Sequence, residues 1–117
     1  TLAQAMEERD VAGDAALCTI VRTIFEHVRA DDVVLRYGGD EFLLMFEEIP
    51  EKVFQQKLED IREEIAMADV PEYKEIRLSM SVGGVYGSCK VRDGVMEADR
   101  LLYQAKRQKN CVAYKRI

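Results

Sequence analysis

Apolar residues recur at helical spacing in three stretches of the chain. In order, the stretches contain Leu17, Val21, Ile24, Phe25 and Val28, then Phe54, Leu58, Ile61 and Ile65, then Val95, Ala98, Leu102 and Ala105. Each set has the spacing of a helix that packs on one face. The first helix is expected to follow Gly13, with Asp14 as its amino-terminal cap. The second is predicted over residues 50–67, and the third follows Asp93-Gly94.

The segments between these helices have the pattern of strands. Residues 33–35 and 42–46 are apolar runs on either side of Gly38-Gly39, which predicts a hairpin with an exposed tip. Apolar and polar residues alternate over residues 76–82, as in a strand with one buried face. Gly83-Gly84 are expected to loosen the far end of that strand.

A closing strand is predicted at residues 111–114, after the third helix. The resulting order is helix, hairpin, helix, strand, helix, strand. This order favours the α+β class, with an antiparallel or mixed sheet flanked by helices. Residues 1–12 look helical or irregular, so the sheet lacks a strand before the first helix.

Composition and charge narrow the class of protein. With 48% hydrophobic and 33% charged residues, the chain is expected to form one compact soluble domain. Its formal net charge is -5, and an acidic domain is a poor general binder of nucleic acid because that affinity comes mostly from neutralising phosphates. No apolar run approaches the roughly 18 residues of a membrane span. We expect a cytoplasmic domain without membrane contact, in a parent protein that can itself be membrane-attached.

The three cysteines, Cys18, Cys89 and Cys111, are odd in number and lack CxxC spacing. This argues against a disulfide framework or a zinc site. We expect buried thiols, the usual location of free cysteine.

The heptapeptide RYGGDEF, residues 36–42, carries the most chemical information. Its two glycines let a ligand approach the backbone closely at the predicted hairpin tip. Asp40 and Glu41 offer adjacent carboxylates, and Mg²⁺ is commonly held by carboxylate oxygens together with substrate phosphates. The residues alone leave two interpretations open, which are a nucleotide–metal site and a polar turn without a ligand.

The same heptapeptide resembles the signature of the GGDEF family, the diguanylate cyclases that condense two GTP into cyclic di-GMP. Other segments resemble family motifs in the same order: Gly13-Asp14 before a long helix, a strand over residues 79–83, and a helix over residues 98–106. The resemblance covers about residues 13–114. It implies a single GGDEF domain over residues 1–117, with the ferredoxin-like, nucleotidyl cyclase palm-like fold of that family.

The resemblance also implies roles for residues at the hairpin tip. Asp40 would be a metal ligand essential for catalysis, and Glu41 a further acidic residue of the metal site, with Mg²⁺ or Mn²⁺ as the cofactor. Gly38 and Gly39 would lie against the nucleotide. In the family mechanism two domains form a homodimer, and each 3′-hydroxyl attacks the α-phosphorus of the opposite GTP.

Further roles fall on residues outside the tip. Asp14 would bind the guanine edge, and Lys106 would contact the terminal phosphates of GTP. Arg29 and Asp32 match the family's RxxD product-inhibition site, because Arg29 lies nine residues before Gly38. The resemblance implies that this pair binds cyclic di-GMP.

The chain departs from the family pattern before Asp14. The first strand, which carries the other metal-binding Asp of the family, would lie before Thr1, and the guanine-binding Asn of the family falls on Ala5. Two explanations remain: the strand belongs to the parent protein ahead of residue 1, or the domain is degenerate. The expected function is therefore a diguanylate cyclase, or alternatively a regulatory module that binds GTP or cyclic di-GMP. In either case we expect an attached sensory or phosphodiesterase domain.

Overall fold

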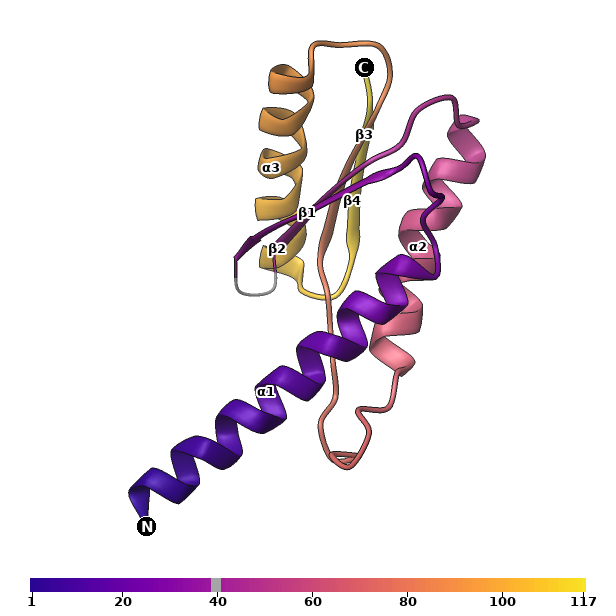
Figure 1. Cartoon of the computed structure of the whole chain (residues 1–117). Coiled ribbons are helices and arrows are strands. Elements are labelled where there is room, and N and C mark those ends of the chain that lie inside the picture. The colour runs from indigo at the N-terminus through magenta and orange to yellow at the C-terminus, as the bar shows by residue number, and fades with distance from the viewer. Residues whose placement is uncertain (39–40) are drawn as a thin grey trace. The chain divides into compact units, whose positions relative to one another are not determined.

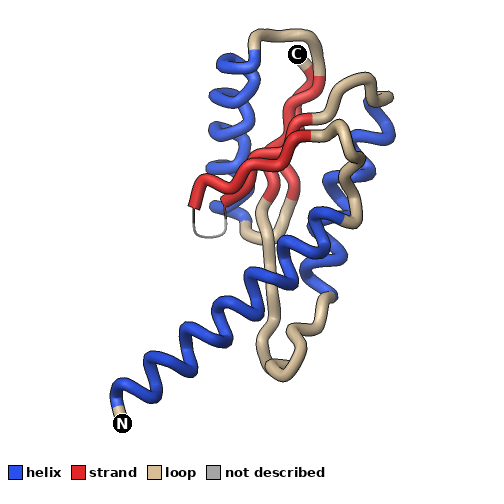
Figure 2. The backbone as a smooth tube through the Cα atoms, viewed as in Figure 1, coloured by secondary structure: helices blue, strands red, loops and turns tan. Residues whose placement is uncertain are grey.

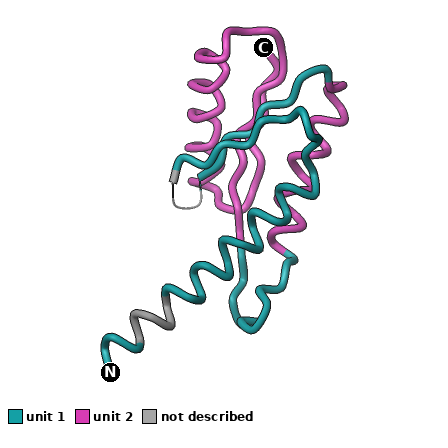
Figure 3. The backbone as a smooth tube through the Cα atoms, viewed as in Figure 1, with its two compact units in different colours: residues 1–48, 67–78 teal, residues 49–66, 79–117 magenta. Residues whose placement is uncertain are grey.

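The computed structural model describes residues 1–38 and 41–117, and for residues 5–9 it describes the backbone only (Figure 1). Its elements are α1 (Leu2–Phe25), β1 (Val33–Gly38), β2 (Glu41–Met45), α2 (Glu51–Met67), β3 (Val82–Tyr86), α3 (Val91–Gln108) and β4 (Val112–Arg116). The chain divides into two compact units, residues 1–48 with 67–78 and residues 49–66 with 79–117 (Figure 3).

The first unit contains α1 and the hairpin β1–β2. The two strands lie side by side (Figure 2). They pair antiparallel, with Val33 opposite Met45 and Leu35 opposite Leu43, and the register shifts between Arg36 and Gly38. This confirms the predicted hairpin.

The second unit contains α2, α3 and the parallel pair β3–β4. Val82 pairs with Val112 and Gly84 with Tyr114, and α3 makes the crossover that parallel strands require. The predicted apolar face of α2 is confirmed, because its four members are buried. On α3 the most deeply buried residues are Leu101 and Ala105. Helices with one antiparallel and one parallel strand pair confirm the α+β class.

The start of α1 differs from the prediction. The helix begins at Leu2, where Thr1 and Gln4 form a capping box, and the Gln4 backbone N–H donates to Thr1 Oγ1 at 3.2 Å. Gly13 and Asp14 therefore lie inside the helix, and Asp14 is not its cap. With the cap supplied by Thr1, the helix continues through Gly13 at a cost of about 1 kcal/mol relative to Ala.

The packed face of α1 is also rotated from the predicted stripe. Phe25 is 56% exposed, whereas Thr19, Ile20, Thr23 and Ile24 are buried. Both threonine hydroxyls are satisfied within the helix, since Thr19 Oγ1 donates to the Ala15 carbonyl and Thr23 Oγ1 to the Thr19 carbonyl. A β-branched polar residue can therefore be buried where the apolar pattern did not indicate it.

The predicted strand over residues 76–82 is wrong in position. Ile76 and Leu78 are half-buried between exposed neighbours, as the alternation predicts, but Met80 and Ser81 are both half-buried and the strand begins only at Val82. A strand needs a hydrogen-bonded neighbour, and β4 supplies it from Val82 onward. The Val82 backbone N–H donates to the Cys111 carbonyl at 2.9 Å, at the start of this ladder.

Gly83 and Gly84 are central to β3 and do not loosen it. A Cβ atom on Gly83 would lie 2.3 Å from the Leu102 backbone nitrogen and 2.4 Å from the Ala98 carbonyl oxygen. One on Gly84 would lie 2.3 Å from Leu58 Cδ1. The glycines thus allow α3 and α2 to pack directly on the strand.

The cysteines differ from the expectation. Cys18 and Cys89 are exposed, and Cys111 is half-buried, where its Sγ donates to the Ala105 carbonyl at 3.4 Å. All three are free thiols. Cys18 is exposed because the neighbouring positions 19 and 20 face the buried side of α1.

Candidate nucleotide and metal site

The pairing of β1 with β2 brings residues 38 and 41 opposite each other. Gly38 pairs with Glu41 and Arg36 with Phe42, so the chain reverses between residues 38 and 41. Gly39 and Asp40, for which nucleotide and metal roles are predicted, lie outside the described residues. Glu41 is exposed at the start of β2, and Tyr37 is 63% exposed beside the tip.

The described acidic residues do not form a complete metal site by themselves. Among them, no group of three or more His, Cys, Asp or Glu side chains could hold a metal ion. The exposed carboxylate of Glu41 is nevertheless an oxygen donor of the kind that Mg²⁺ and Mn²⁺ prefer. Substrate phosphates commonly complete such a coordination sphere, so Glu41 fits as one oxygen ligand of a nucleotide-bound divalent metal.

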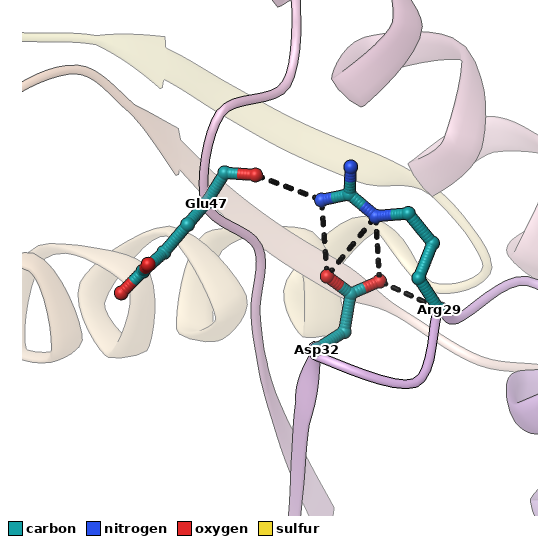
Figure 4. A network of polar contacts seen from close by, with 3 residues as sticks. All are labelled: Arg29, Asp32 and Glu47. Carbon is teal, nitrogen blue, oxygen red and sulfur yellow. Dashed lines mark hydrogen bonds and ion pairs between the residues drawn. The ribbon is translucent and has the colours of Figure 1, made fainter.

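The structure brings Arg29 and Asp32 together in the turn between α1 and β1 (Figure 4). Arg29 Nη2 donates to Asp32 Oδ1 at 3.0 Å, and the Arg29 backbone N–H donates to Asp32 Oδ2 at 2.7 Å. The Asp32 side chain is 2% exposed and that of Arg29 is 50% exposed. Hydrogen bonding to Asp32 is the main cause that raises the pKa of the Arg29 guanidinium.

A third group joins this pair. Arg29 Nη2 also donates to the backbone carbonyl of Glu47 at 2.8 Å, just after β2 (Figure 4). The turn before β1 is thereby tied to the segment after β2, at the end of the hairpin opposite its tip. Sequence reasoning missed Glu47, and no signal could have indicated it, because the acceptor is a backbone atom.

The two remaining predicted ligands, Asp14 and Lys106, belong to different compact units. Asp14 is exposed on α1 in the first unit, and Lys106 is exposed in the last turn of α3 in the second unit. Their contacts with guanine and phosphate stay predictions. Across the residues that the structure describes, no helix is both long enough and apolar enough to cross a membrane.

Comparison with known proteins identifies the family. A family model described as "Diguanylate cyclase, GGDEF domain" matches residues 10–111. The chain is 30% identical over 94 residues to diguanylate cyclase DgcM of Escherichia coli K12, and 32% identical over 100 residues to diguanylate cyclase DosC of the same strain. These matches cover 80% and 82% of the chain but only 23% and 22% of the relatives, so the chain spans less than a quarter of their length.

Solved structures agree with this match. The active GGEEF domain of a diguanylate cyclase from Vibrio cholerae superposes with a TM-score of 0.76 at 23% identity, over 89% of this chain and 69% of that one. The diguanylate cyclase SiaD from Pseudomonas aeruginosa, solved with its activator SiaC, gives a TM-score of 0.75 at 26% identity, over 87% and 41%. The fold and the family model agree, and the chain belongs to the GGDEF family of diguanylate cyclase domains.

Proposed function

We propose that this domain condenses two GTP into cyclic di-GMP with release of pyrophosphate. The observation that carries the proposal is the RYGGDEF heptapeptide at a hairpin whose register turns the chain between Gly38 and Glu41. The relatives named as diguanylate cyclases support it. They do not favour the alternative of a regulatory module without catalysis.

In the proposed reaction the hairpin tip holds the triphosphate. Asp40 and Glu41 would hold Mg²⁺ or Mn²⁺, and the bound ion would supply positive charge that neutralises the phosphates. The 3′-hydroxyl of one GTP would displace pyrophosphate from the other in line. Gly38 and Gly39 would let the phosphates approach the backbone, because no Cβ atom intervenes. Asp14 would accept hydrogen bonds from the guanine edge, and Lys106 would donate to the terminal phosphates. Two copies of the domain, each holding one GTP, would form the catalytic homodimer.

The proposed activity is tested by product formation from GTP and Mg²⁺, measured by liquid chromatography. Asp40→Asn is expected to lower the rate by roughly a hundredfold or more, because a metal ligand is lost while the side-chain volume is kept. Glu63→Gln is the matched control, since it removes one exposed negative charge on α2, outside the heptapeptide. An Asp40→Asn variant with unchanged activity would overturn the proposal.

We further propose that Arg29 and Asp32 bind cyclic di-GMP as a product-inhibition site. Asp32 orients the guanidinium, and the half-exposed Arg29 side chain can donate to a guanine edge or a phosphate. In calorimetry, Arg29→Ala should weaken cyclic di-GMP binding at least about tenfold, which is the loss of one charge-assisted contact. Arg77→Ala is the control, because Arg77 is an exposed arginine in another ion pair of the same unit. Equal affinity of the two variants would refute the assignment.

The wider setting is also a proposal. Residues 1–117 would act as one domain, because the family match runs through both compact units. The relatives are longer than this chain, and one is named a bifunctional diguanylate cyclase and phosphodiesterase, MucR of Pseudomonas aeruginosa. We therefore expect an attached sensory or phosphodiesterase domain, and a cytoplasmic location where GTP is available.

A further inference from the structure

Helix α1 carries exposed apolar residues that the proposed reaction does not use. Val11 is 55% exposed and Phe25 is 56% exposed, and Cys18, midway between them, is also exposed. Residues seven apart on a helix differ in direction by only about 20°, so the three form one stripe. The buried Ile20 and Ile24 lie on the other side of the helix. Val11 and Phe25 alone do not make an extended apolar patch, so an interface here depends on the symmetry and the charges of this face.

The stripe is symmetric about Cys18. Val11 and Phe25 lie seven residues before and after it. If a second α1 packs antiparallel, with the two-fold axis beside Cys18, Val11 of each copy meets Phe25 of the other, and the two Cys18 residues face each other. A two-fold interface requires this kind of self-complementary patch.

The charges beside the stripe fit the same arrangement. Asp14 and Arg22 lie four residues before and after Cys18, and both are exposed. The two-fold operation therefore places Asp14 of each copy beside Arg22 of the other, so that opposite charges meet twice. Farther from the stripe, Asp10 falls near Glu26 of the other copy, and this like-charge pair limits the strength of the contact.

We propose that α1 pairs antiparallel with α1 of a second copy of this chain, centred on Cys18. This contact includes Asp14, the proposed guanine ligand, so it pairs copies that hold no GTP and differs from the catalytic pairing of hairpin tips. A few turns of helix cover less than the roughly 1,200 Å² of a standard interface, so the isolated association is weak. Domains that hold two chains together would raise its occupancy through effective concentration.

Charge reversal tests the register of the pair. In sedimentation velocity without nucleotide or metal, Asp14→Arg and Arg22→Asp should each raise the dimer dissociation constant roughly tenfold, because two attractions become repulsions. The double variant should restore the parent value. Circular dichroism checks that the helix is intact. Single variants that associate like the parent, or a double variant that stays weakened, would overturn the proposal whatever the enzymatic activity.

Cross-linking tests the position of the axis independently. In a Cys89→Ser, Cys111→Ser background, a short bismaleimide should join two chains through Cys18 in high yield. The matched control keeps Cys89 alone, which is also exposed but lies before α3. Equal yields from the two thiols would refute the pairing. Protection of Cys18 in a monomer would also refute it, because another segment would then cover the stripe.

Discussion

Replacing Gly83 by Ala is expected to force β3 and α3 apart. The added methyl group would lie 2.3 Å from the Leu102 nitrogen and 2.4 Å from the Ala98 carbonyl oxygen, against ordinary contacts of about 3.5 Å or more. Both clashing atoms belong to the α3 backbone, so no side-chain rotation can relieve them. The helix must shift by about 1 Å, which disturbs the packing of the buried Leu101 and Ala105.

The loss in free energy of unfolding for Gly83→Ala follows from the usual cost of overpacking a core. Overpacking a well-packed core costs typically 1–3 kcal/mol, and a clash against backbone atoms belongs at the upper end, at about 3 kcal/mol. For a domain of this size, that loss lowers the melting temperature by roughly 10–20 °C. At Gly84 the clash is with the flexible end of Leu58, so Gly84→Ala should cost less than Gly83→Ala.

Urea unfolding followed by circular dichroism measures these free energies. Gly13→Ala is the control for the loss of a glycine: Gly13 is exposed within α1, and a Cβ atom there would meet nothing within 4 Å. That variant should be more stable than the parent by about 0.5–1 kcal/mol. A Gly83→Ala variant that loses less than about 1 kcal/mol would refute the close approach of α3 to β3.

Other predictions concern single polar groups in the second unit. Tyr114→Phe should leave the free energy of unfolding unchanged or raise it by about 1 kcal/mol, because the buried hydroxyl has no hydrogen-bond partner among the described residues. Tyr86→Phe should lower the free energy of unfolding by about 1 kcal/mol, since the Tyr86 hydroxyl donates to the Ile49 carbonyl at 2.7 Å. Equal urea midpoints for Tyr114→Phe and Tyr86→Phe would contradict this contrast. A hydrogen bond from Arg100 lowers the pKa of Glu97, so the folded chain binds that proton less readily than the unfolded chain. The resulting stabilisation should be present above the ordinary pKa of 4.5 and be lost as the pH falls through the lowered pKa of Glu97 in the folded chain. NMR titration should show a higher Glu97 pKa in Arg100→Gln than in the parent.

The amino-acid pattern alone was enough for the elements that depend on local spacing. The apolar face of α2 and the hairpin around Gly38 were predicted because a helix period and a turn between apolar runs are encoded within a few neighbouring residues. The heptapeptide at residues 36–42 was likewise enough to indicate the family that the comparisons confirm.

Tertiary structure decided the features that depend on residues far apart in the chain. The position of β3 depends on pairing with β4, about thirty residues later, so alternation over residues 76–82 could not locate it. Arg29 binds the carbonyl of Glu47, an acceptor that every residue type possesses. The rotation of α1 that buries Thr23 and exposes Phe25 follows from packing and from hydroxyl groups satisfied within the helix. Local pattern therefore determined which elements form, whereas long-range pairing and packing determined where strands begin and which side chains face solvent.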